Sequence, residues 1–204
     1  MPRWIVGTDM ERETELALVR RLREGDPGAF DAVYAEYHAR LFSFLARLSR
    51  RRDVAEDLLE ETWLRLVASG GRLQADTRLG PWLYTVARNL FYSYNRSRQI
   101  DESCAAGLIG LWPAGTRQPS PFEEAAAREL ERHVERALAS LPARDREVLL
   151  LVGVEGLAPA EAATVCGVTA ETMRQRLSRA RARLGLALGR TASEPVLLAS
   201  EVAP

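Results

Sequence analysis

Apolar residues along most of this chain recur three or four positions apart. In one long stretch after Asp26 they fall at Phe30, Val33, Tyr37, Leu41, Phe44 and Leu48. This spacing places the apolar side chains on one face of an α-helix. Asp26 followed by Pro27 supplies an N-cap and a first-turn proline for that helix. No stretch alternates with the period of two typical of a strand, so the pattern predicts an all-α protein.

The same signals divide the chain into two groups of helices. The first group contains four predicted helices. They run from near Thr14 to Glu24, from Pro27 through the last apolar position at Leu48, from an Asp53 N-cap to about Ala68, and from 80–81 to about Arg98. In the second group, they are predicted over residues 121–140, 142–152, 159–165 and 170–188. Periodicity is lost over residues 99–120, where glycine, proline, serine and alanine dominate. We therefore expect two small helical bundles, at 11–98 and 121–189, joined by a flexible linker at 99–120 and followed by a disordered tail at 190–204.

Composition adds few constraints. The 204 residues carry a formal net charge of +0, and all 28 basic residues are arginine. GC-rich coding explains arginine usage, although arginine also suits bidentate contact with phosphate and guanine. No apolar run reaches the roughly 18–20 residues that span a bilayer, and the N-terminal residues lack a secretory signal. We expect a cytoplasmic protein.

Cysteine and histidine are too sparse to indicate a metal site. Cys104 and Cys166 lie far apart in different contexts, and His38 and His133 are isolated. A disulfide framework or a zinc site needs closer and more numerous ligands. The sequence therefore predicts no metal and no cofactor, with Cys104 interpreted as an ordinary linker thiol.

The last helical stretch contains a helix-turn-helix pattern. A short helix over 159–165 and a turn at 166–168 precede an arginine-rich helix, the order in which a recognition helix enters a DNA major groove. Met173, Leu177, Ala180 and Leu184 share one face of this helix, which we expect to be buried. The opposite face carries groups that can bind bases and phosphates: Glu171, Arg174, Gln175, Ser178, Arg179, Arg181 and Arg183. A solvated basic helix without specific use is the alternative.

The stretch from Asp53 to Val67 combines an acidic run with large apolar residues. A helical wheel places Trp63, Leu64 and Val67 on or near the acidic face. Apolar anchors ringed by charge are typical of a protein–protein docking surface. The alternative is that Trp63 packs back into the bundle. The predicted docking residues are Asp53, Glu56, Asp57, Glu60, Glu61 and Leu64.

Arginine and aromatic residues are interleaved over 72–98. Such surfaces bind unstacked bases of single-stranded nucleic acid. Part of the aromatic content must be core, and Trp82 and Phe91 are expected to be buried. The predicted contact residues are Arg72, Leu73, Gln74, Arg78, Arg88, Asn89 and Arg96.

Five short motifs, taken in order, resemble those of bacterial extracytoplasmic-function sigma factors of the sigma-70 family. Residues 25–30, 55–63 and 82–89 are similar to the region 2 signature, and residues 141–149 and 176–181 to region 4. The resemblance implies that the acidic helix docks on the β′ clamp helices of RNA polymerase and that region 4 meets the β flap. It also implies that the arginine-aromatic segment opens the −10 element and holds a flipped base, and that the basic helix reads the −35 element. An anti-sigma factor is a further implied partner.

Two positions depart from the family pattern. Glu60 stands where the family usually has glutamine, which bears on polymerase affinity. Leu73 stands where many members carry an aromatic residue, which bears on the flipped-base pocket.

Two other functions are weighed against this one. A free-standing helix-turn-helix repressor or activator would bind duplex DNA alone as a dimer. It would not require the acidic docking face or the second arginine surface. An enzyme would need a phosphate loop, a metal cluster or a nucleophile with its base, and the sequence contains none in compatible contexts. We therefore expect no enzymatic activity.

Overall fold

The computed structural model describes residues 11–97 and 121–193, with side chains described for 11–97 and 129–190. Within these ranges the chain is helical and contains no strand. No helix among them is both long and apolar enough to cross a membrane. The predicted linker at 99–120 with Cys104, and the tail beyond residue 193, lie outside the described residues.

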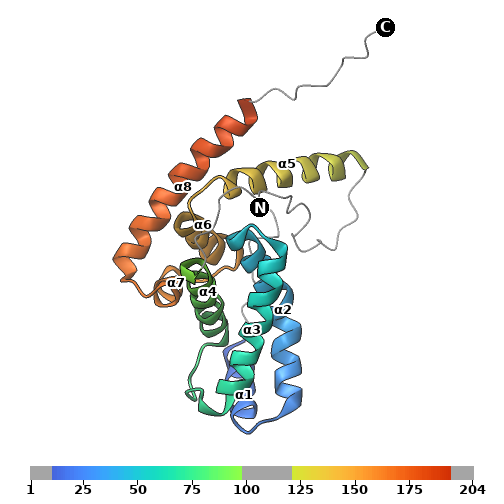
Figure 1. The fold of residues 1–204 in the computed structure, drawn as a ribbon, viewed down its shortest axis with the longest axis vertical. Helices are drawn as coiled ribbons and strands as arrows, with labels where there is room; N and C mark the ends of the chain where they lie inside the picture. Colours follow the sequence, from blue (N-terminus) through green and yellow to red (C-terminus); the bar gives the residue numbers. More distant parts are fainter. Residues whose placement is uncertain (1–10, 98–120, 194–204) are drawn as a thin grey trace.

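The first group of helices comprises α1 (Arg12–Arg23), α2 (Pro27–Ser49), α3 (Arg52–Ser69) and α4 (Leu79–Ser97), with a short 3₁₀ turn, η2 (Gly70–Arg72), after α3. As predicted, Asp26 caps α2 by accepting a hydrogen bond from the backbone N–H of Gly28. The helix ends at Arg50, which adopts the left-handed conformation with φ 61°. α3 then runs back along α2, and α4 packs against both (Figure 1).

The predicted N-cap of α3 is wrong. The helix begins two residues earlier than expected, with Arg51 at the capping position and Asp53 inside the first turn. Asp53 forms an ion pair with Arg51 instead of capping the helix. Hydrogen bonding from Arg51 and from the backbone lowers the pKa of Asp53, and the carboxylate also lies near the positive end of the helix dipole.

The second group comprises α5 (Pro121–Ala139), α6 (Ala143–Leu149), α7 (Pro159–Cys166) and α8 (Ala170–Ser193). The predicted 142–152 helix is shorter than expected, because it passes into a π turn, η3 (Leu150–Val154). The backbone N–H of Glu155 bonds to the carbonyl of Leu150 at 2.9 Å, which closes this wide turn. α8 continues to Ser193, so the first residues of the predicted tail are helical.

The two groups of helices pack on each other. α4 lies against α7, and the end of α2 lies against α6 (Figure 1). Buried apolar side chains from both groups, including Phe44, Tyr84, Leu150 and Met173, belong to one cluster. Sequence periodicity predicted two bundles but did not predict this packing.

Candidate nucleic-acid and polymerase interfaces

The helix-turn-helix is formed by α7, a turn at Gly167 and α8. Gly167 has φ 63°, a left-handed conformation that glycine adopts without strain. The side-chain oxygen of Thr169 accepts a hydrogen bond from the backbone N–H of Thr172 and so caps α8. Met173, Leu177 and Ala180 are buried, which fixes the rotation of α8 about its own axis. Leu184 is partly buried against the core.

The opposite face of α8 is exposed. Two of its arginines form ion pairs: Arg174 with Glu171 one turn away, and Arg183 with Asp145 of α6. Hydrogen bonds from Arg174 and then Gln175 lower the pKa of Glu171. The residues predicted for DNA contact on this helix are all exposed: Glu171, Arg174, Gln175, Ser178, Arg179, Arg181 and Arg183.

The acidic face of α3 points away from the core. Its carboxylates at Asp53, Glu56, Asp57 and Glu60 are exposed, and Glu61 is half-buried. Leu64 and Val67 beside them are 55% and 66% exposed, so two aliphatic side chains lie in solvent next to the carboxylates.

Trp63 does not belong to this exposed surface. Its side chain is only 7% exposed, because it packs against aromatic residues of α2. The ring centroid of Trp63 lies 4.9 Å from that of Tyr34 and 5.8 Å from that of Phe30. The helical wheel allowed Trp63 to point either to solvent or into the bundle. The structure shows that it packs into the bundle, against aromatic residues of α2.

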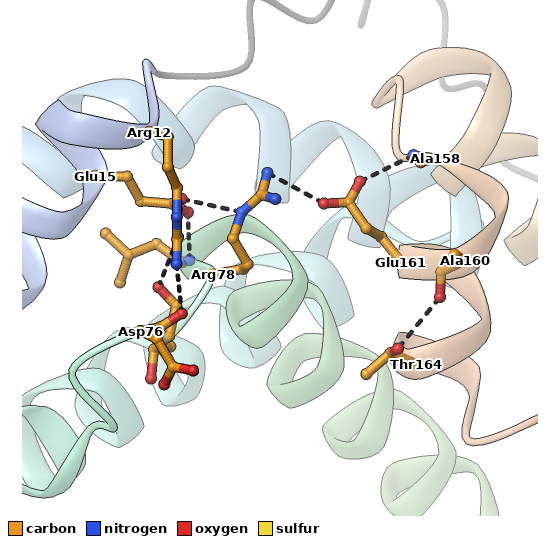
Figure 2. Close-up of polar contacts among 10 residues, drawn as sticks. Arg12, Glu15, Asp76, Arg78, Ala158, Ala160, Glu161 and Thr164 are labelled. Atoms are coloured by element: carbon orange, nitrogen blue, oxygen red, sulfur yellow. Dashed lines mark hydrogen bonds and ion pairs between the residues drawn. The ribbon is translucent and has the colours of Figure 1, made fainter.

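The loop before α4 is held by α1. Glu15, buried at 2% exposure, accepts a hydrogen bond from the backbone N–H of Leu79 at 2.6 Å and pairs with Arg78 at 3.0 Å. Arg12 donates to the backbone carbonyls of Asp76 and Thr77 (Figure 2). The sequence interpretation missed both α1 residues. A charged Glu15 on the apolar face of a short helix was the available signal.

Several residues predicted to contact the −10 element differ in accessibility. Leu73 is only 6% exposed, so little of its side chain is accessible in this structure. Arg78 and Arg88 are half-buried by partners described below. Phe91 is buried as predicted, whereas Trp82 is only partly so. The predicted residues that are exposed are Arg72, Gln74, Asn89 and Arg96.

Carboxylates from the second group of helices reach the α4 side chains. Arg88 forms an ion pair with Glu147 of α6, and Tyr92 donates to the same carboxylate at 3.0 Å. Tyr84 donates a hydrogen bond to Glu155, which also pairs with Arg40 of α2 at 3.2 Å. These carboxylates were not identified from sequence. Glu155 was detectable as the single charge within the stretch 148–157.

Arg78 joins the two groups of helices at a third point. Its guanidinium lies between Glu15 of α1 and Glu161 of α7, with 3.1 Å from Arg78 Nη2 to Glu161 Oε1 (Figure 2). The other oxygen of Glu161 accepts from the backbone N–H of Ala158 at 3.0 Å, which anchors it at the start of α7. Arg78, predicted to contact DNA, is therefore occupied on both sides by carboxylates.

Burial shifts the pKa of several groups between the two halves. Burial raises the pKa of Glu155 above its usual value, although hydrogen bonds from Tyr84 and Arg40 partly oppose this. Burial, and then the charge of Glu147, raises the pKa of the Cys166 thiol to about 12. In the described residues, no cluster of three or more histidine, cysteine or acidic side chains could hold a metal ion.

The sequence matches two family models and a group of related proteins. Residues 33–100 match the family model of sigma-70 region 2, and residues 131–184 match that of sigma-70 region 4. The sequence is 37% identical over 148 residues to an extracytoplasmic-function (ECF) RNA polymerase sigma factor, EcfG, of Rhodopseudomonas palustris. That alignment covers 72% of this chain and 78% of the relative.

Two solved structures share the fold. CnrH, in complex with the cytosolic domain of CnrY, matches 86% of this chain and 97% of its own with a TM-score of 0.64 at 22% identity. The sigma factor RpoE of Bartonella quintana, in complex with the anti-sigma factor NepR, matches 87% and 95% with a TM-score of 0.55 at 26% identity.

The chain belongs to the ECF group of sigma-70 family RNA polymerase sigma factors. It binds core RNA polymerase and directs promoter-specific initiation by recognising −35 and −10 elements.

Proposed function

We propose that the exposed face of α8 reads the −35 element. The observation that carries this assignment is the orientation of α8, whose apolar face is buried while Arg174, Gln175 and Arg179 face outward. Arginine pairs with guanine O6 and N7, and glutamine with adenine. Arg181 and Arg183 flank these residues and suit phosphate contact. Glu171 and Ser178 complete the contact surface.

We propose that the acidic face of α3 docks on the β′ clamp helices. Exposed aliphatic side chains surrounded by charge are poorly solvated, and a partner that buries Leu64 while pairing with Asp57 gains from both contacts. Asp53, Glu56, Glu60 and Glu61 extend the charged rim. Region 4 would meet the β flap.

The segment from the 73–78 loop through α4 is assigned to the −10 element. Arg72, Gln74, Asn89 and Arg96 are exposed on it. Arg78 and Arg88 belong to the same segment and are paired with carboxylates. Leu73, at 6% exposure, is the least accessible residue of the predicted set. The proposed division is region 2 at 11–98, a linker at 99–120, region 4 at 121–189 and a short tail.

The partners and the cellular location follow from this assignment. The relationship to a sigma factor crystallised with an anti-sigma factor supports an anti-sigma protein as a partner of this chain. RNA polymerase and promoter DNA are the other partners, which implies action in the cytoplasm. The chain contributes recognition, and catalysis belongs to the polymerase.

A double variant tests the polymerase contact. Asp57→Asn with Leu64→Ser removes the charge and the exposed apolar anchor, and should abolish co-elution with core RNA polymerase in gel filtration. Circular dichroism should stay unchanged, because both side chains are exposed. Glu13→Gln on α1, an exposed carboxylate outside the docking face, is the matched control. Retained co-elution of the double variant would show that α3 is not the docking helix.

A binding measurement separates this function from a free-standing repressor. Duplex promoter DNA, chosen by mapping transcript start sites after overexpression, is titrated with the protein alone and with core polymerase present. A sigma factor should bind poorly until the polymerase is added. Tight binding of the isolated protein as a dimer would contradict the proposal.

A further inference from the structure

The loop between η2 and α4 exposes a short tip. Residues 74–76 are exposed, whereas Leu73 before them is 6% exposed and Leu79 after them is fully buried. The backbone N–H of Thr77 donates to the carbonyl of Gln74 at 3.1 Å, which folds the loop back on itself. The loop therefore presents residues 74–76 to solvent between two buried ends. We call residues 74–76 the loop tip.

Two side chains of α1 hold the C-terminal end of this loop. Arg12 donates to the carbonyl of Asp76 at 2.7 Å and to that of Thr77 at 3.4 Å (Figure 2). Glu15, which is 2% exposed, accepts a hydrogen bond from the backbone N–H of Leu79 at 2.6 Å. Arg12 and Glu15 also pair with each other, with 2.6 Å from Nη1 to Oε2. The loop is thus fixed through its backbone, at the last residue of the tip and at the start of α4.

The same helix supports the other end of the loop. The short η2 turn that leads into the loop lies on the C-terminal part of α1. A Cβ atom at Gly70 would lie 3.3 Å from the carbonyl oxygen of Leu22, so this close approach suits a glycine. α1 therefore contacts the chain on both sides of the loop tip. All of these contacts join residues of region 2, so they do not depend on region 4.

The contact between Glu15 and the start of α4 has a clear electrostatic basis. α4 begins at Leu79, whose backbone N–H belongs to the first turn and has no acceptor inside the helix. A carboxylate placed there accepts a charge-assisted hydrogen bond and meets the positive end of the helix dipole. The same carboxylate lies 3.0 Å from Arg78 Nε. Glu15 therefore fixes the start of α4 relative to α1.

We propose that Arg12 and Glu15 are positioning residues for recognition of the −10 element. They hold the loop tip so that the side chain of Gln74 meets one base of the element in a fixed place, and they do not contact that base themselves. This inference rests on the proposed function, which assigns the loop and α4 to the −10 element. An amide side chain distinguishes bases only when it is held in the correct place. A loosely held tip would still bind DNA but would distinguish bases poorly.

A brace that only stabilised the fold would behave differently. Its loss would lower the amount of folded protein and would reduce transcription equally from every promoter. Loss of a positioning brace changes the ratio between promoters that differ in one base. The ratio is therefore the measurement that separates the two roles.

The test uses four single variants of the full-length chain. Arg12→Ala removes the bonds to the loop carbonyls and spares the core, because this side chain is 41% exposed. Arg12→Lys keeps the positive charge, but one ammonium group lacks the planar fork that reaches the carboxylate and both carbonyls. Glu15→Gln keeps an acceptor oxygen for the N–H of Leu79 and loses the charge. Arg20→Ala, an exposed arginine of the same helix, is the matched control.

The first measurement is made on the isolated chains. Amide hydrogen exchange is followed by mass spectrometry in a peptide covering residues 73–80, where the N–H groups of Thr77 and Leu79 are hydrogen-bonded. Exchange should be about tenfold faster in Arg12→Ala, with Arg12→Lys between it and the parent. Circular dichroism should stay unchanged in both. Arg20→Ala should exchange at the parent rate.

The second measurement is made on the holoenzyme reconstituted with core RNA polymerase. It transcribes a pool of templates with a fixed −35 element and a randomised −10 element, each identified by a barcode in its transcribed part. Arg12→Ala and Glu15→Gln should each weaken the base preference at one −10 position by about tenfold. In a second pool with a randomised −35 element, both variants should keep the parent's preference. Arg20→Ala should match the parent in both pools.

A double variant shows whether Arg12 acts through the loop tip. Gln74→Ala alone should lose the preference at the same −10 position. Adding Arg12→Ala to Gln74→Ala should then change that preference little further, because residues that act through one contact are not additive. Additive losses would overturn the positioning role.

The remaining outcomes separate this inference from the proposed function. If the parent prefers certain −10 sequences and Arg12→Ala and Glu15→Gln keep that preference, the positioning role is overturned and the −10 assignment stands. A loss equal on all templates, with the salt slope of DNA binding reduced by about 1, would make Arg12 a phosphate contact and would also overturn it. If the parent shows no preference among −10 sequences, the proposed function is wrong. Should Glu15→Gln alter the circular dichroism, the two Arg12 variants decide.

Discussion

Two arginine surfaces of this protein differ in what covers them. On α8, Arg174 has a side chain 65% exposed, and its partner Glu171 lies on the same helix. On α4, Arg88 has a side chain 20% exposed, and its partner Glu147 comes from the other half of the molecule. The two arginines are chemically identical and both lie on amphipathic helices. Only the element packed against each one distinguishes them.

This difference shows that residue type defines what a side chain can bind, whereas packing defines when it can bind. On the α8 face, Arg174 pairs within its own helix and stays exposed to solvent. In the α4 segment, Arg78 and Arg88 are instead paired with carboxylates of the other group of helices. Thiol reactivity and variants test this contrast on either side, and the expected effects range from about a thousandfold to less than tenfold.

The largest effect is expected at the Cys166 thiol beside the covered surface. Its pKa is raised by burial from an ordinary value of 9.0 to about 12. At pH 8 it should therefore hold about a thousand times less thiolate than an exposed cysteine, and react correspondingly slowly with iodoacetamide. The rate should rise about tenfold per pH unit as the pH approaches this raised pKa. Peptide mapping by mass spectrometry gives the rate, and the urea-unfolded chain is the reference. Equal rates in the folded and unfolded chains would contradict the buried position.

The next largest effect concerns the carboxylate that holds the loop before α4. Glu15→Ala leaves the backbone N–H of Leu79 without its acceptor and removes the partner of Arg12 and Arg78. We expect a loss of about 3 kcal/mol in the free energy of unfolding, measured by urea denaturation. The exposed Glu13 on the same helix is the control, and Glu13→Ala should stay within about 0.5 kcal/mol of the parent. Equal effects of the two substitutions would refute the role of Glu15.

On the exposed face of α8, the largest losses of promoter recognition are expected from residues that contact bases. Arg174→Ala or Arg179→Ala should each cost roughly 1–3 kcal/mol at the −35 element. Run-off transcription with core polymerase on a mapped promoter measures the loss. Arg190→Ala, an exposed arginine farther along α8, should leave transcription unchanged. If promoter choice is the same with and without Arg174 and Arg179, α8 does not read the element.

The smallest effect is expected for a phosphate contact. Arg181→Ala should weaken DNA binding by the assembled holoenzyme uniformly across sequences, by less than about tenfold. It should also reduce the slope of log affinity against log salt by about 1. Titrations over a salt series on matched and scrambled −35 sequences measure both quantities. A sequence-dependent loss would instead make Arg181 a base contact.

Much of the local structure could be predicted from sequence because its causes are local. The α2 cap at Asp26, the turn at Gly167 and the buried stripe of Met173 and Leu177 depend on residues within a few positions of each other. The predicted N-cap of α3 was wrong by two residues, because Asp53 lies in the first turn and forms an ion pair with Arg51 there. The site residues on α8 were located correctly on the exposed face by periodicity alone, although their roles stay a prediction.

What the tertiary structure decided involves partners distant in sequence. Trp63 is buried because α2 presents Phe30 and Tyr34 to it, and Leu73, which was predicted as a −10 contact, is only 6% exposed. Glu161 lies 83 positions from its partner Arg78, and Glu147 lies 59 positions from its partner Arg88. Helical periodicity cannot predict contacts between residues so far apart in the sequence.

The sequence by itself determined the helices, their buried faces and the family, because backbone caps, the 3.6-residue period and short motifs are properties of neighbouring residues. Only the tertiary structure decided which arginines are covered. A charge acquires its partner when two helices meet, and the free energy of that contact depends on burial and distance in three dimensions.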